Sequence, residues 1–197
     1  MQHGKIIALE GIDMSGKTTV AQNAVAELRR KGYMVQTADE LGGEIGQVVR
    51  GFLRGKATTE PEVLALLFAA ARLDLLHRIE PFRDAGVSFV FDRFLWSSLV
   101  YYQSARNEIE WVKQINLCTP SAHLNLILDL DPHIAATRRD ARADIWDGDL
   151  EFQLRVRAGY LTLVREHSTT SCLVNADRKR SAVLDSVVRA IRKCLDA

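Results

Sequence analysis

Short apolar runs along the chain alternate with longer segments in which apolar residues recur at helical spacing. Several of the short runs are apolar on consecutive residues, which is typical of strands in a parallel sheet that is covered on both faces. The runs that we interpret as strands are Lys5–Glu10, Tyr33–Ala38, Ser88–Phe91, Leu124–Leu130 and Ser171–Val174.

The segments between these strands are predicted to be helices, because their apolar residues recur every three or four positions. Strands that alternate with helices form βαβ units with right-handed crossovers. We therefore expect an α/β fold of three layers, with a five-stranded parallel sheet flanked by helices, in a single domain over residues 1–197. Ligands of such sheets bind beyond the carboxyl ends of the strands. The clearest helical patterns are Ala21, Ala24, Val25, Leu28 and Leu184, Val187, Val188, Ile191, Leu195.

A complete phosphate-binding loop motif, GxxxxGK[ST], directly follows the first predicted strand. The glycines allow backbone N–H groups to point at phosphate oxygens, and the helix that begins near Lys17 adds the positive end of its dipole. Lys17 is expected to reach the β- and γ-phosphates, and the Thr18 hydroxyl to ligate Mg²⁺. The P-loop residues predicted to bind the nucleotide are Gly11, Ile12, Asp13, Met14, Ser15, Gly16, Lys17 and Thr18.

The motif by itself does not separate kinases from GTPases or ATPases. The segment Asp39–Gly42 matches the DxxG pattern of GTPases, but no NKxD guanine-reading sequence is present. The segment Asn175–Asp177 has the wrong spacing and lacks the lysine. A GTPase is therefore disfavoured.

Asp92 and Arg93 follow the third predicted strand and form the second candidate site. A carboxylate at this position can support Mg²⁺ or its waters, or orient an attacking oxygen. The adjacent arginine can hold a phosphate through two parallel hydrogen bonds. The alternative is a simple ion pair at the end of a strand, which the nearby P-loop makes the weaker interpretation.

The P-loop, the Asp92–Arg93 pair and several further stretches together make the chain resemble the thymidylate kinases, a family of P-loop nucleoside monophosphate kinases. The resemblance implies the fold of that kinase class with a short lid, usually in a homodimer. It also implies ATP and Mg²⁺ as co-substrates and transfer of the γ-phosphoryl group to dTMP. The stretches that carry it run in family order from residue 8 to about residue 161: ALEGIDMSGKTT, ELGG with IG behind it, LLFAAAR, FDRF followed by SSLVY, LILDLDP and LEFQLRVRAGYL.

The resemblance also assigns residues to the acceptor pocket. Asp13 matches a P-loop aspartate near the acceptor, and Phe68 matches the aromatic residue that stacks on the thymine ring. Arg72 matches an arginine of the base and phosphate pocket, and it shares a helix face with Phe68 because the two are four residues apart. Arg93 is expected on the acceptor phosphate. Three further matches complete the pocket: Glu40 in the loop after the second strand, and Ser98 and Tyr101 beside the nucleotide.

A basic cluster follows the fourth predicted strand and a short helix, in the expected lid at about residues 138–150. Phosphoryl transfer spreads negative charge over the migrating group, and an arginine brought in by closure offsets that charge. Arg138 and Arg139 are therefore predicted to bind the nucleotide and Arg142 to act in catalysis, with Lys17, Asp13, Asp92 and Arg93 as the other catalytic candidates. A solvated basic helix face is the alternative for each lid arginine.

Several positions depart from the family pattern. A basic residue of the loop after the second strand is replaced by Asp39, a proline by Leu41, and an acidic residue before Arg72 by Ala71. Trp96 stands where an aspartate is usual, and the lid segment 144–147 lacks an expected arginine. Asp39 and Trp96 are thus candidates for reshaping the pocket. The alternatives are a kinase for a different or modified nucleotide or nucleoside, and a nucleotide-binding protein without transfer.

Composition narrows the partners further. The chain carries 26 basic and 25 acidic residues, so no excess positive charge is available to hold a nucleic acid. The longest apolar run is far shorter than the roughly 20 residues that span a bilayer, and the N-terminus lacks a signal-peptide core. The three cysteines are widely spaced, which favours reduced thiols. We expect a cytoplasmic protein with a small-molecule nucleotide substrate and no nucleic-acid or membrane partner.

Overall fold

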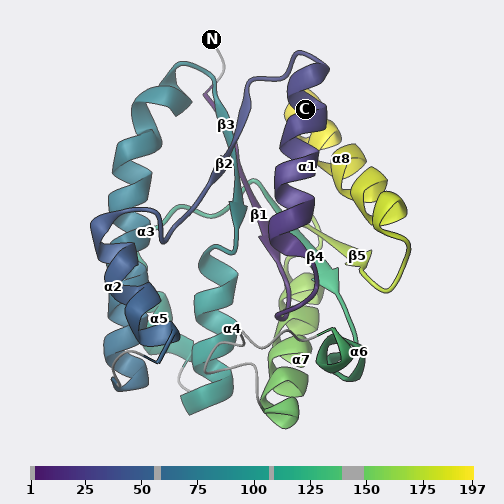
Figure 1. Ribbon diagram of the computed structural model, residues 1–197. Helices are drawn as coiled ribbons and strands as arrows, with labels where there is room; N and C mark the ends of the chain where they lie inside the picture. The colour runs from purple at the N-terminus through teal and green to yellow at the C-terminus, as the bar shows by residue number, and fades with distance from the viewer. Residues whose placement is uncertain (1–2, 56–58, 107–108, 139–148) are drawn as a thin grey trace.

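The computed structural model describes residues 3–55, 59–106, 109–138 and 149–197, and Figure 1 shows how their helices surround a central sheet. All five strands of the sheet are parallel, in the order β2-β3-β1-β4-β5. The five predicted strands are confirmed, each with boundaries within two residues of the prediction. They are β1 Ile6–Glu10, β2 Val35–Ala38, β3 Ser88–Asp92, β4 Leu124–Asp129 and β5 Ser171–Asn175.

The helices connect the strands, and some of them begin at a proline or a capping side chain. Pro61 is the first residue of the longest helix, a position where its missing N–H leaves no hydrogen bond unmade. The Asp149 side chain accepts a hydrogen bond from the Phe152 backbone N–H and so caps the helix that follows it. The helices are α1 Lys17–Arg30, α2 Glu44–Leu53, α3 Pro61–Asp84, α4 Leu95–Arg106, α5 Ile109–Ile115, α6 Pro132–Thr137, α7 Leu150–Glu166 and α8 Arg180–Asp196.

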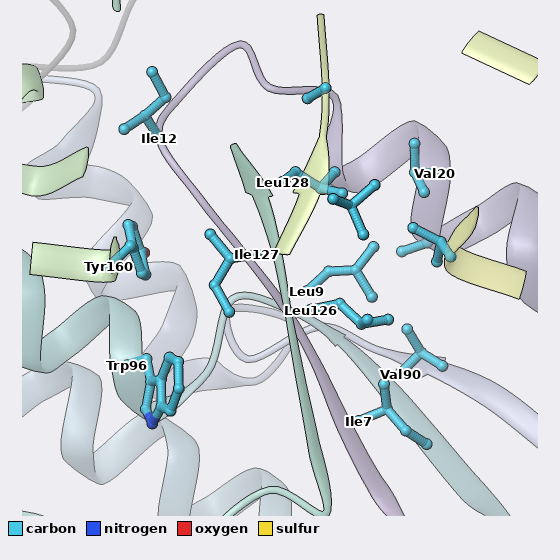
Figure 2. Close-up of a cluster of buried hydrophobic side chains, with 14 of the residues drawn as sticks. Ile7, Leu9, Ile12, Val20, Val90, Trp96, Leu126, Ile127, Leu128 and Tyr160 are labelled. Carbon is cyan, nitrogen blue, oxygen red and sulfur yellow. The ribbon is translucent and has the colours of Figure 1, made fainter. Parts of the chain in front are cut away.

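Both faces of the sheet are covered, as the consecutive apolar residues predict. All five residues of β1 are buried. Leu9 belongs to the cluster that β1 forms with α1 and α8, whereas Ala8 belongs to the cluster beneath α3. Figure 2 shows Leu9, Leu126 and Val20 on one side of the strands, with Tyr160 and Trp96 on the other.

The topology brings the chemically interesting segments to one edge of the sheet. The P-loop joins β1 to α1, and β3, the neighbour of β1, ends at Asp92. The loop at 39–43 follows β2, which lies beside β3. None of the described helices has the length and apolar character needed to cross a membrane.

Candidate active site

The P-loop has the backbone shape that a phosphate cradle needs. Gly11, Met14 and Gly16 have φ values of 138°, 62° and 91°, so the loop folds back over the end of β1. A Cβ atom at Gly11 would lie 2.6 Å from the Leu128 carbonyl oxygen of β4. Glycine is therefore required at position 11 both by conformation and by space.

Lys17 lies folded over the loop that precedes it. Its ammonium group donates hydrogen bonds to the Ile12 carbonyl oxygen at 2.7 Å and the Ser15 hydroxyl at 3.4 Å. Burial, with a smaller contribution from the Arg93 charge, lowers the pKa of Lys17 to about 8, while Asp13 and other carboxylates oppose the shift. A phosphate held by the loop would favour the charged form of this lysine, because a nearby negative charge offsets the loss of hydration that burial causes.

Thr18 and Asp92 meet where β3 ends and α1 begins. The Thr18 hydroxyl donates a hydrogen bond to the Asp92 carboxylate. A hydroxyl and a carboxylate are the hard oxygen donors that Mg²⁺ prefers, and Mg²⁺ is usually held by one or two protein groups together with phosphates and waters. The donor set therefore fits Mg²⁺.

Arg93 connects the P-loop to α4. Its guanidinium forms an ion pair with the Asp13 carboxylate and donates to the Gly11 carbonyl oxygen at 3.0 Å. The Tyr101 hydroxyl donates to the other Asp13 oxygen at 2.9 Å, and the Arg93 guanidinium carbon lies 4.9 Å from the centre of the Tyr101 ring. Arg93 has a φ of 70°, a conformation rare for a residue with a side chain. Three of the residues predicted to act on the acceptor thus form one cluster.

A buried carboxylate that the sequence analysis did not single out supports this cluster. Glu10, the last residue of β1, is fully buried and accepts hydrogen bonds from the backbone N–H groups of Phe94 at 3.0 Å and Ser97 at 3.3 Å. The hydroxyls of Ser97 and Tyr160 also donate to it. Burial raises the pKa of Glu10, although the hydrogen bonds from Ser97 and Phe94 and the charge of Arg93 oppose the shift. The carboxylate fixes the turn between β3 and α4 that carries Arg93.

A cavity of about 560 Å³ opens beside the P-loop, between α2, α3 and α4. Its volume lies in the range of small-molecule sites. Phe68 and Arg72 line it from adjacent turns of α3, so the predicted shared face is present. The predicted residues that line the cavity are Asp13, Thr18, Glu40, Phe68, Arg72, Asp92, Arg93, Ser98 and Tyr101.

Two of the residues that line the cavity, Arg72 and Glu40, form a buried ion pair. The Arg72 guanidinium is 1% exposed and lies 2.9 Å from the Glu40 carboxylate, at an angle that makes a charge contact without a directed hydrogen bond. Burial raises the pKa of Glu40 to about 7, while Arg72 opposes the shift. Arg72 also donates to the Ser98 hydroxyl at 2.5 Å. Its Nε atom has no hydrogen-bond partner among the described residues.

Comparison with known proteins identifies the family. The thymidylate kinase family model matches residues 9–187. The chain belongs to the thymidylate kinase family. It is 37% identical over 191 residues to a probable thymidylate kinase of Pyrobaculum calidifontis, covering 96% of both chains. It is 34% identical over 203 residues to a thymidylate kinase of Bacillus cereus, covering 95% of this chain and 97% of the relative.

The fold is also that of the thymidylate kinases. A structure of thymidylate kinase from Candida albicans superposes with a TM-score of 0.81 at 20% sequence identity. The alignment covers 97% of this chain and 92% of the other. This match confirms the predicted α/β class with a five-stranded parallel sheet.

The structure separates the departures from the thymidylate kinase pattern into two groups. Asp39 lines the cavity, where its carboxylate lies 2.6 Å from the Arg50 guanidinium of α2. Arg50 also lines the cavity, and sequence reasoning missed it because nothing local to α2 marks it. Trp96, in contrast, lies outside the cavity lining and packs beside His167, with the ring centres 5.6 Å apart. The suggestion that Trp96 reshapes the pocket was therefore wrong, because its ring faces the α4–α7 packing.

The predicted lid is described only in part. Arg138 ends α6 as an exposed side chain, 3.4 Å from Asp177 in the loop after β5. Arg139 and Arg142 lie outside the described residues, as does the segment 144–147. On α7, Arg157 is held by Asp129 through contacts of 2.7 and 3.1 Å. Arg157 therefore links α7 to the end of β4.

Proposed function

We propose that this protein transfers the γ-phosphoryl group of ATP to dTMP, giving dTDP and ADP. The observation that carries the proposal is the single cavity in which the P-loop side, with Thr18 and Asp13, faces Phe68, Arg72 and Arg93. Membership of the thymidylate kinase family supports the choice of dTMP. Neither the family match nor the relatives described above favour the other acceptors or a protein without transfer.

The proposed reaction assigns a task to each side of the cavity. An oxygen of the dTMP phosphate attacks the γ-phosphorus, a new P–O bond forms, and the bond to the bridging oxygen breaks so that ADP leaves with its electron pair. Lys17 and the P-loop N–H groups hold the β- and γ-phosphates. Arg93 binds the acceptor phosphate, in competition with its ion pair to Asp13.

The thymine ring is proposed to lie deeper, near α3. Phe68 offers a flat apolar surface to the ring, and Arg72 lines the cavity beside it. Aromatic stacking and a few convergent polar groups are the usual means by which a pocket fixes a flat ligand. Glu40, Ser98 and Tyr101 complete the proposed acceptor site.

Mg²⁺ is proposed as the metal, with the Thr18 hydroxyl and the Asp92 carboxylate as the groups that would hold it or its waters. When bound, the ion neutralises charge on the transferred phosphoryl group. A single kinase domain over residues 1–197, a lid at about 138–150 with Arg138, Arg139 and Arg142, a homodimer and a cytoplasmic location are further parts of the proposal. They rest on the family resemblance.

The direct test is ADP release from ATP with and without Mg²⁺, across dTMP, dUMP, the other common monophosphates and thymidine. Preferred turnover of dTMP supports the proposal, and preference for another acceptor or no turnover at all contradicts it. Phe68→Ala should raise the KM for dTMP more than the KM for ATP. Phe82→Ala is the matched control, because Phe82 is an exposed residue of the same helix outside the cavity lining.

A further inference from the structure

The Arg72 guanidinium is held by groups from three separate parts of the chain. Glu40 contacts it from the loop after β2, Ser98 from α4, and Asn116 from the turn that follows α5. The contact with Asn116 is a hydrogen bond of 2.5 Å from Arg72 Nη1 to the side-chain oxygen Oδ1. Asn116 is 4% exposed, so the hydrogen bond is shielded from water.

The orientation of the Asn116 amide follows from its neighbours. Its Nδ2 atom donates to the Val112 carbonyl oxygen of α5 at 2.8 Å. A flipped amide would place Nδ2 against the Arg72 donor and Oδ1 against the carbonyl oxygen, and both contacts would then be repulsive. Val112 therefore fixes the amide so that its oxygen faces the guanidinium.

Asn116 differs from the other two partners in its position. Glu40 and Ser98 line the cavity and can meet a nucleotide directly, whereas Asn116 lies outside the lining. Any effect of Asn116 on the acceptor must therefore pass through Arg72. Because Nη1 donates to Asn116 and Nη2 donates to Ser98, these two contacts fix the plane of the Arg72 guanidinium.

We propose that Asn116 is a positioning residue of the acceptor pocket, which holds the Arg72 guanidinium in the orientation that meets the acceptor nucleotide. The inference rests on the proposed function, in which Arg72 contacts dTMP. The sequence offers no signal for it, since Asn116 lies 44 residues from Arg72. In this arrangement the turn after α5 supports the acceptor site although it does not line the cavity.

The test compares three variants of the full-length protein. Asn116→Ala removes both amide contacts. Asn116→Asp keeps an oxygen toward Arg72 but places the second oxygen against the Val112 carbonyl group, so it should lower thermal stability while preserving the contact to the guanidinium. Asn125→Ala is the matched control, since Asn125 is also 4% exposed but lies near the amino end of β4, away from the cavity. The readouts are the melting temperature and the KM for dTMP and for ATP.

We expect Asn116→Ala to raise the KM for dTMP by about tenfold, the size expected from loss of one hydrogen bond to a charged group, with the KM for ATP within about twofold. Asn116→Asp should keep the KM for dTMP within about threefold despite its lower stability, and Asn125→Ala should change stability alone. A KM for dTMP that follows melting temperature across all three variants, or that does not change in Asn116→Ala, overturns the positioning role. A wild-type protein that neither binds nor phosphorylates dTMP overturns the proposed function itself, and this inference with it.

Discussion

Asp13 and Arg93 form an ion pair that joins the P-loop after β1 to the residue that follows β3. Both side chains line the cavity and are about one quarter exposed, at 28% and 25%. In the proposed reaction, the acceptor phosphate would approach the γ-phosphoryl group beside this pair. An acceptor phosphate bound as proposed would compete with Asp13 for the Arg93 guanidinium.

Replacing Arg93 with alanine should mainly damage use of the acceptor. A hydrogen bond to a charged group contributes about 1.5–3 kcal/mol, so kcat/KM for dTMP is expected to fall by roughly 10- to 150-fold. The KM for ATP should change much less. Steady-state kinetics with dTMP varied at saturating ATP would measure the loss. Arg192→Ala is the control, because Arg192 is an exposed arginine of α8; equal effects in the two variants would refute the assignment.

Glu10→Ala should destabilise the fold, because it leaves the Phe94 and Ser97 N–H groups buried without their acceptor. Each lost partner of a buried donor costs about 1–3 kcal/mol, and we expect a total of about 3 kcal/mol in the free energy of unfolding. Urea denaturation would measure it. Glu27→Ala, which removes an exposed pair with Lys31 on α1, should change little. If both variants unfold at the same urea concentration as the wild type, Glu10 does not support the turn.

The strands and the P-loop could be predicted because their signals are local in the sequence. Consecutive apolar residues mark a buried parallel strand, and GxxxxGK[ST] directly after one marks a phosphate cradle. Glu10 was overlooked because its partners Ser97 and Tyr160 lie 87 and 150 residues away. A buried polar residue has no periodic signature, so only the packed structure reveals what it binds.

Asp39 and Trp96, which depart from the family pattern, also show what the sequence can and cannot predict. Asp39 lines the cavity, since a loop that follows a strand lies near the ligand site of a parallel sheet. Trp96 was suspected because it departs from the family pattern, yet it is the second residue of α4 and its buried ring lies next to His167. The sequence indicates which segment reaches the site, but the turn of the helix decides which side chains of that segment enter it.

The affinity for ATP should weaken as the pH rises through about 8. Burial lowers the pKa of Lys17 to about 8 in the free protein, and phosphate binds the protonated form. Above that pH the lysine must take up a proton when ATP binds, so the dissociation constant should increase by up to about tenfold per pH unit. Titration calorimetry from about pH 7.5 to about pH 9.5 would measure this dissociation constant. The Lys17→Arg variant should bind ATP with an affinity that does not change over this pH range. If its dissociation constant rises with pH as steeply as that of the wild type, Lys17 is not the cause.

Glu40 should make the protein less stable as the pH rises from about 4.5 to about 7. Its folded pKa of about 7 lies above the ordinary value of 4.5, because burial favours the protonated form. The folded state therefore binds more protons than the unfolded state in this window, and the stabilisation present below pH 4.5 is lost as the pH passes through 7. A pKa shift of this size corresponds to about 3 kcal/mol in the free energy of unfolding.

Glu40→Gln isolates the contribution of Glu40 from that of every other titrating group. The variant keeps the shape of the side chain but cannot ionise, so its free energy of unfolding should fall less than that of the wild type between about pH 4.5 and about pH 8. Urea denaturation of both proteins across this range gives the difference curve. A curve that rises with the pH toward about 3 kcal/mol in favour of the variant is the expected result. A flat curve would mean that Arg72, which lies 2.9 Å from Glu40, compensates fully for the burial of the carboxylate.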